Sequence, residues 1–103
     1  MIKKLEEGAF LFAEGKLEEA ESCFQSIIEE DSKNKVAYNN IGVVAYIMND
    51  LEKAVDYFAM SLNEDPYFED ALENLFDLLR VLDCSHLVAS YLEEITEFDP
   101  QLN

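Results

Sequence analysis

Apolar residues recur along this chain at the three- to four-residue spacing that places them on one face of an α-helix. In the middle of the chain, one such face is made by Val36, Ile41, Val44, Ala45 and Met48, and a second by Leu51, Ala54, Val55, Phe58 and Leu62. The same spacing predicts further helices near 2–14, 17–31, 69–82 and 85–98. We therefore expect six helices in three antiparallel pairs, which together account for almost the whole chain.

Short polar turns separate the predicted helices. Gly15-Lys16, Asn49-Asp50 and Asp83-Cys84 lie inside the three pairs. Asp50 is suited to cap the helix that begins near Leu51, because an aspartate side chain accepts hydrogen bonds from the free N–H groups at a helix start. Pro66 ends the middle pair, since proline cannot continue a helix and restricts the residue before it.

The chain matches itself when it is shifted by 34 residues. The matched positions are Gly8 with Gly42, Leu17 with Leu51, Ala20 with Ala54, Phe24 with Phe58, and Ile28 with Leu62. A second shift of 34 carries Asp65-Pro66 onto Asp99-Pro100. Several matches at one offset indicate a repeat architecture, in which stacked units share a continuous core.

The middle unit carries the most regular pattern. It reads Tyr38-x2-Ile41-Gly42-x2-Ala45, followed by Ala54-x3-Phe58 and then Pro66. This pattern closely resembles the signature of the tetratricopeptide-repeat (TPR) family. The resemblance covers essentially all of 1–103 and implies an all-α fold, a right-handed α-α superhelix formed by a single TPR domain. Its three repeats would span 1–34, 35–68 and 69–102.

The outer repeats depart from the signature. In the first, Lys4 stands where a large aromatic residue is usual, Glu7 where an apolar residue is usual, and Ser32 replaces the proline. In the third, Phe76 occupies the small-residue position. Because Phe76 is too large for a close helix approach, we expect the third pair to be looser or differently angled than the second.

The repeated small residues predict how the helices of a pair pack. We expect the glycines to face the alanines where the two helices approach most closely, because small residues let backbones come near without a void. The phenylalanines would then fill the wider space between one pair and the next. The residues concerned are Gly8 and Gly42, Ala20 and Ala54, and Phe24 and Phe58.

Charge narrows the range of partners. The chain has 7 basic and 23 acidic residues, which gives a net charge of −16. Such a field repels nucleic acid and anionic membrane surfaces, so we expect neither as a partner. The start of the chain has no secretory signal, because Glu6 and Glu7 follow its lysines directly, and the 2 cysteines are too few for a disulfide framework. We therefore expect a cytoplasmic protein with reduced thiols.

The sequence offers little material for catalysis. The spacing of Cys84 and the single histidine, His86, could place two ligands near a metal ion, but nothing supplies the other two. The many glutamates fall on polar helix faces, and no phosphate-binding loop or nucleophile motif is present. We therefore expect no enzyme activity, no metal and no cofactor.

The resemblance implies a binding surface. In TPR proteins the first helices of the pairs line a concave groove that commonly holds peptides or helices. The residues expected in this groove are Ile2, Leu5, Ala9, Phe12, Val36, Asn39, Asn40, Val43, Tyr46, Ile47, Asp70, Glu73, Asn74, Asp77 and Arg80. The groove would run from apolar to acidic and would suit a protein or peptide with apolar anchors and basic residues. Equally, Ile2, Leu5 and Phe12 could pack within the first helix pair.

One specialisation of the family does not fit. TPR modules that clamp the C-terminal carboxylate of chaperones resemble one another in carrying Lys and Asn on the first repeat, Asn on the second, and Lys and Arg on the third. Only Asn40 agrees, because the other positions hold Leu5, Ala9, Asp70 and Asn74. A chaperone tail would bring its carboxylates against Asp70 with no cation to offset the repulsion.

The end of the chain carries a second candidate surface. The last predicted helix has a broad apolar stripe made by Leu87, Val88, Tyr91, Leu92, Ile95 and Phe98. Exposed together, these residues would mark an interface, so either the native protein continues past 103 or two copies associate as a homodimer. We therefore expect a protein-interaction module. The alternatives are a domain appended to a larger enzyme and a purely self-assembling element.

Overall fold

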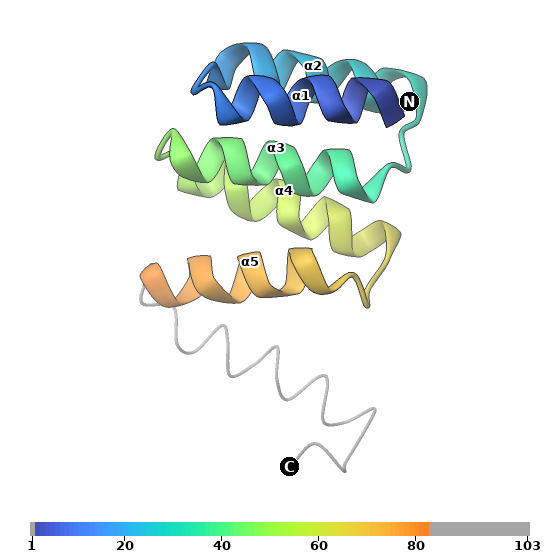
Figure 1. Ribbon diagram of the computed structural model, residues 1–103. Helices are drawn as coiled ribbons and strands as arrows, with labels where there is room; N and C mark the ends of the chain where they lie inside the picture. Colours follow the sequence, from blue (N-terminus) through green and yellow to red (C-terminus); the bar gives the residue numbers. More distant parts are fainter. Residues whose placement is uncertain (1, 83–103) are drawn as a thin grey trace.

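The computed structural model describes residues 2–82, and these residues form five helices (Figure 1). They are α1 (Ile2–Ala13), α2 (Leu17–Glu30), α3 (Lys35–Ile47), α4 (Leu51–Glu64) and α5 (Glu69–Val81). The part of the chain that the structure describes contains no strand, so the predicted all-α class is confirmed. Each of the five helices agrees with its prediction to within a residue or two. The sixth predicted helix, 85–98, lies outside the described residues.

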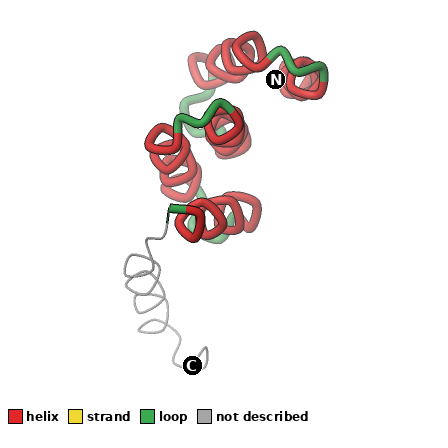
Figure 2. Tube along the Cα trace, turned by 90° about the vertical axis from the view of Figure 1, so that its left-hand side faces the viewer, coloured by secondary structure: helices red, strands yellow, loops and turns green. Residues whose placement is uncertain are grey.

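The helices stack side by side as antiparallel neighbours. α1 packs on α2 and α3 on α4, while α2 contacts α3 and α4 contacts α5, so each pair leans on the next. Figure 1 shows α1, α3 and α5 on the side facing the viewer, with α2 and α4 behind them. The view turned by 90° keeps these two rows on opposite sides of the stack (Figure 2). This arrangement is the α-α superhelix expected from the repeat.

The turns follow from local chemistry. The Asp50 side chain accepts a hydrogen bond from the Lys53 N–H, which confirms the predicted cap of α4. Asn34 caps α3 in the same way by accepting from the Ala37 N–H. Lys16 occupies the equivalent position before α2 and makes no side-chain cap. In the first turn Gly15 has φ 79°, a left-handed conformation that glycine adopts without strain.

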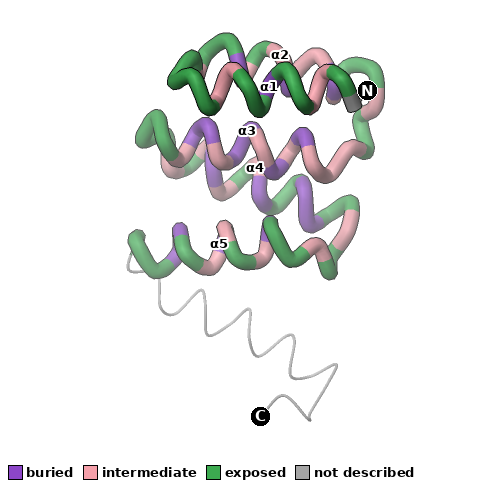
Figure 3. The backbone as a smooth tube through the Cα atoms, in the orientation of Figure 1, coloured by how far each residue is buried: buried purple, intermediate pink, exposed green. Residues whose placement is uncertain are grey.

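Two clusters of buried side chains hold the stack together. The first core cluster lies mainly between α2 and α3 and consists of Ala20, Phe24, Ile27, Ala37, Ile41 and Val44. The second core cluster joins the end of α3, α4 and α5, and consists of Ala45, Ala54, Phe58, Leu62, Ala71, Leu75, Leu78 and Leu79. Burial is densest on α3 and sparse on the outer face of α1 (Figure 3). Each cluster thus joins one helix pair to the next, as stacked repeats require.

The packing around the glycines differs in part from the prediction. A Cβ atom on Gly8 would lie 2.3 Å from Cε1 of Phe24, and one on Gly42 would lie 2.5 Å from Cε1 of Phe58. The phenylalanine rings therefore occupy the space that the glycines leave free within each helix pair. Both rings also belong to the core clusters that join successive pairs. The prediction that these rings fill the space between pairs is therefore incomplete, because the missing Cβ of each glycine also makes room for a ring within its own pair.

Two further predictions from the sequence concern the third helix pair and the membrane. Phe76 is half-buried on α5, but the second helix of its pair, predicted at 85–98, lies beyond the described residues, so the geometry of the third pair stays a prediction. None of the helices described between 2 and 82 combines the length and apolarity that crossing a bilayer requires.

Candidate peptide-binding surface

The candidate surface is formed by the first helices of the pairs, α1, α3 and α5, and we call it the groove face. Figure 1 shows these three helices as one row. α3 and α5 contact each other directly along this row. Because they share the same direction, residues 34 positions apart lie at the same level on neighbouring helices. The groove face therefore brings together side chains that are far apart in the sequence.

A hollow of about 140 Å³ opens between α1 and α3. Ala9 and Phe12 line it from α1, Asn40 and Val43 line it from α3, and Phe24 of α2 lies at its base. Four of these five residues were predicted from the sequence to lie in the groove. Phe24 was not, because it was assigned to packing between pairs. The Asn40 side chain makes no hydrogen bond to any other described residue, so its amide remains available to a ligand.

The other apolar candidates divide between packing and exposure. Leu5 and Phe12 are half-buried and pack against the first core cluster, and Phe12 lines the hollow as well. Val43 and Tyr46 pack against the second core cluster, and Val36 is half-buried. Ile47, by contrast, is 55% exposed at the end of α3. The structure thus gives Leu5 and Phe12 a core contact without closing the hollow beside Phe12.

Two predicted groove residues bind each other. The Asn74 side-chain Nδ2 on α5 donates to the Asn39 Oδ1 on α3 over 3.0 Å. Asn39 is 6% exposed, so little of its side chain is left for a ligand. A hydrogen bond between buried amides is favourable because an unpaired buried amide is costly. This pair therefore links α5 to α3 along the groove face, beside the apolar contacts of the second core cluster.

The α5 end of the groove face is acidic. Asp70, Glu73, Asp77 and Arg80 are all exposed there. Arg80 forms an ion pair with Asp77, three residues earlier on the same helix. Neither Asp70 nor Glu73 forms an ion pair with a described residue. Their charges therefore have no cation partner among the described residues.

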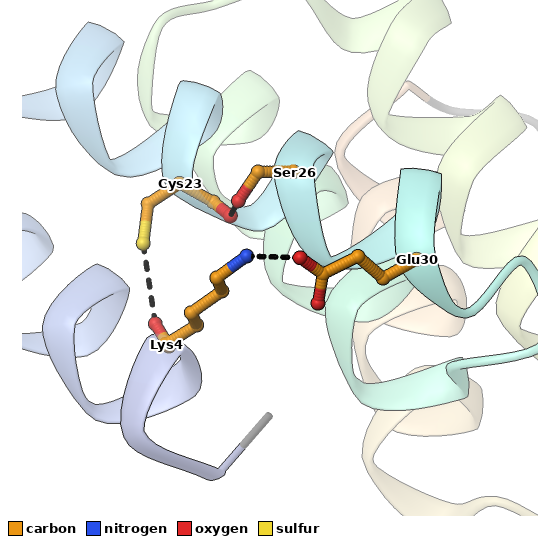
Figure 4. Close-up of polar contacts among 4 residues, drawn as sticks. All are labelled: Lys4, Cys23, Ser26 and Glu30. Carbon is orange, nitrogen blue, oxygen red and sulfur yellow. Dashed lines mark hydrogen bonds and ion pairs between the residues drawn. The ribbon is translucent and has the colours of Figure 1, made fainter.

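A polar cluster between α1 and α2 stands where the second repeat has an aromatic contact (Figure 4). In the second repeat, the rings of Tyr38 and Tyr57 lie 6.2 Å apart. The positions 34 residues earlier hold Lys4 and Cys23, where the Cys23 thiol donates to the Lys4 backbone oxygen over 3.2 Å. Partial burial raises the pKa of this thiol, so the reactive thiolate is disfavoured. The Cys23 thiol thus links α2 to the backbone of α1.

Lys4 also holds the end of α2. Its ammonium group forms an ion pair of 2.5 Å with Glu30, while the Ser26 hydroxyl donates to the Cys23 backbone oxygen (Figure 4). The hydrogen bond with Glu30 raises the pKa of Lys4, and the same bond lowers the pKa of Glu30. Both groups are therefore charged at neutral pH, and the pair ties α1 to α2 where an aromatic residue is usual.

Several predicted residues are not placed by the structure. No three His, Cys, Asp or Glu side chains between 2 and 82 are grouped so that they could hold a metal ion. Cys84 and His86 lie outside the described residues. So does the whole candidate edge of the last helix: Leu87, Val88, Tyr91, Leu92, Ile95 and Phe98. Self-association through that edge stays a prediction.

The fold resembles that of solved TPR proteins. No protein-family model and no curated protein matches the sequence. The first TPR of Spaghetti (RPAP3), bound to the HSP90 peptide SRMEEVD, is 18% identical, with a TM-score of 0.81 over 96% of this chain and 80% of that chain. YrrB, a TPR protein with an unusual peptide-binding site, is 24% identical, with a TM-score of 0.77 over 94% of this chain and 50% of that chain. The chain therefore has the tetratricopeptide-repeat fold that its 34-residue period predicts.

Proposed function

We propose that this protein is an interaction module that binds a peptide or helix of another protein along the groove face. The observation that carries the proposal is the hollow between α1 and α3, whose walls are made by Ala9, Phe12, Asn40 and Val43. Concave, mostly apolar sites with a few polar groups are the usual form of a binding pocket. Two structures of the same fold are described as peptide-bound or peptide-binding, which is consistent with this use of the fold.

The charge of the groove face favours a basic partner. Asp70 and Glu73 are exposed on α5, and the chain as a whole has a net charge of −16. The peptide bound to the first TPR of Spaghetti, SRMEEVD, is rich in carboxylates. This chain would repel such a peptide, since Asp70 carries a like charge and Leu5 and Ala9 supply no cation to offset it. We therefore assign it a peptide with apolar anchors and Lys or Arg side chains.

Selection of random peptides on the immobilised protein, followed by NMR mapping of the selected peptide, tests the proposal. We expect amide shifts concentrated on α1, α3 and α5, at residues such as Ala9, Asn40 and Val43. Shifts confined to the outer sides of α2 and α4, at Ala59 and Met60 for example, would contradict it. Net positive charge in the selected sequences would support the partner chemistry, and net negative charge would exclude it.

The proposal is one of binding, in which the chain supplies a surface and no reacting group. We infer that the whole of 1–103 forms one domain of three repeats that presents this surface. Light scattering over a range of protein concentrations tests the separate prediction of a homodimer. A constant monomer mass would rule the homodimer out and leave the groove face unaffected.

A further inference from the structure

The hollow exists because one residue on α1 is small. Ala9 is exposed and lies in the hollow's wall, and the residue 34 positions later on α3 is Val43. Val43 is half-buried and packs against the second core cluster. The α1 side of the hollow therefore carries an alanine, Ala9, whereas the equivalent position of the second repeat carries the branched side chain of Val43. The departure of the first repeat from the second at this position leaves space that the rest of the packing does not use.

The hollow has the size and chemistry of a site for one side chain. Its volume, about 140 Å³, is close to that of an engineered protein cavity of about 150 Å³ that binds benzene. Ala9, Phe12, Phe24 and Val43 make the wall apolar. Asn40 adds one amide whose donor and acceptor make no hydrogen bond within the described residues. An amide beside an apolar hollow can bond the backbone of a peptide whose side chain fills the hollow.

The exposed carboxylates on α5 favour a positively charged occupant of the groove face. On α5 Arg80 is paired with Asp77, whereas Asp70 and Glu73 have no cation partner among the described residues. Opposite charges steer association and exclude partners of the wrong sign. The exposed carboxylates thus complement a peptide that carries lysine or arginine beyond its apolar anchor.

We propose that this hollow is an anchor subsite that takes one bulky apolar side chain, of the size of leucine, methionine or phenylalanine, from an extended peptide whose basic residue meets Asp70 and Glu73. This inference rests on the proposed peptide-binding function and specifies the ligand. It requires one apolar position in the peptide and one region of positive charge. It also predicts that the subsite depends on the absence of a larger side chain at position 9.

The substitution Ala9→Val tests the anchor directly, because it places in the first repeat the residue that the second repeat carries. The probes are the peptides selected on the immobilised protein, synthesised with both ends blocked and measured by fluorescence anisotropy. We expect Ala9→Val to weaken binding by about tenfold to a hundredfold, the range that loss of one buried apolar side chain implies. Replacing the peptide's apolar residue by alanine should weaken binding to the natural chain similarly, and have little further effect on Ala9→Val.

Ala59→Val is the matched control, since Ala59 is an exposed helix residue on α4, away from the hollow. It should leave the affinity within about twofold. The double variant Asp70→Asn/Glu73→Gln should weaken binding in low salt and reduce its dependence on salt concentration. The two proposals fail differently. Peptides that map to the groove face but bind Ala9→Val unchanged would overturn the anchor alone. Peptides that map elsewhere, or no selected peptide at all, would overturn both.

Discussion

At the scale of single residues, Gly8 and Gly42 are each matched to one phenylalanine ring. Phe24 and Phe58 are 2% and 1% exposed, and each ring fills the space where its glycine lacks a Cβ atom. Glycine in the middle of a helix costs about 0.5–1 kcal/mol relative to alanine. Tight packing of a whole aromatic ring offsets this cost, since large rings dominate the energetics of small cores. Each glycine and its phenylalanine therefore stabilise the fold together, because the ring fits only where the Cβ atom is missing.

Gly42→Ala tests this pairing. The new Cβ atom would lie 2.5 Å from Cε1 of Phe58, far inside contact distance, so the buried ring must move. Overpacking of this kind costs about 1–3 kcal/mol, which exceeds the gain in helix propensity. We expect a net loss of roughly 1–2 kcal/mol in the free energy of unfolding, measured with urea. In a Gly42→Ala background, Phe58→Leu should cost less than it does alone. Equal costs would show that the ring and the glycine are independent.

The sequence predicts which positions must be small, but it does not predict what they face. A 34-residue match identifies Gly8 and Gly42 as one structural position, because periodicity records which face of a helix a residue occupies. It does not record the rotation of the facing helix. The phenylalanines were therefore assigned to the space between pairs, and Phe24 was missed as the base of the hollow. A smaller residue at position 9 than at position 43 was the available signal.

At the scale of helices, the start of α2 lacks the cap that α4 has. Lys16 and Asp50 are equivalent residues with similar backbone angles, φ −86° and ψ 71° against φ −95° and ψ 78°. Lys16→Asp should therefore let a carboxylate accept from the N–H of Glu19. It also places a negative charge at the positive end of the helix dipole. We expect a gain of about 0.5–1 kcal/mol by urea unfolding, and a comparable loss for Asp50→Lys.

Lys33→Asp is the control for the change in charge. Lys33 is exposed in the turn before α3, so the substitution alters the net charge by the same amount without occupying the cap position of α2. We expect no gain from it. A gain equal to that of Lys16→Asp would mean that charge, and not the cap, is responsible.

The contact between α3 and α5 includes one pair of hydrogen-bonded amides. Asn74→Ala removes the donor to Asn39, and Asn39 is too deeply buried to find water easily. An unsatisfied buried amide costs about 1–3 kcal/mol, so we expect a loss of that size. Hydrogen exchange should show weaker protection in α5, with a smaller change in α2. Glu73→Ala, an exposed neighbour on the same helix, should stay within about 0.5 kcal/mol of the natural chain.

The helices themselves were predictable because their determinants are local. Apolar period, turn residues and the Asp50 cap all act within a few residues, and the five described helices match their predictions. The candidate site was predicted only as a set of positions. Asn39 was expected to face a ligand, yet it is buried because α5 supplies Asn74 as its partner. Contacts between helices of different repeats depend on tertiary geometry, which periodicity does not contain.

At the scale of the whole molecule, the net negative charge lowers the stability of the folded chain. With 23 acidic and 7 basic residues, the net charge of −16 makes the folded chain repel itself. Against this, the described residues form four ion pairs, each at least partly exposed to solvent. Exposed pairs contribute only about 0–1 kcal/mol each. Repulsion summed over the surface should therefore outweigh these local attractions.

The effect of salt on stability shows whether the surface repulsion or the ion pairs contribute more, because salt screens both. The Debye length falls from about 30 Å at 0.01 M to about 3 Å at 1 M ionic strength. We expect the Tm to rise as sodium chloride is increased over this range, since relief of repulsion exceeds the loss of the ion pairs. Each kcal/mol gained would raise the Tm by about 4–8 °C for a domain of this size. Glu6→Gln/Asp56→Asn, at two exposed helix positions outside the first turns and in no ion pair among the described residues, should raise the Tm in low salt and reduce its salt response. A Tm that falls with added salt would instead show that the ion pairs dominate, and Lys4–Glu30 and Lys53–Glu21 would be the first to examine.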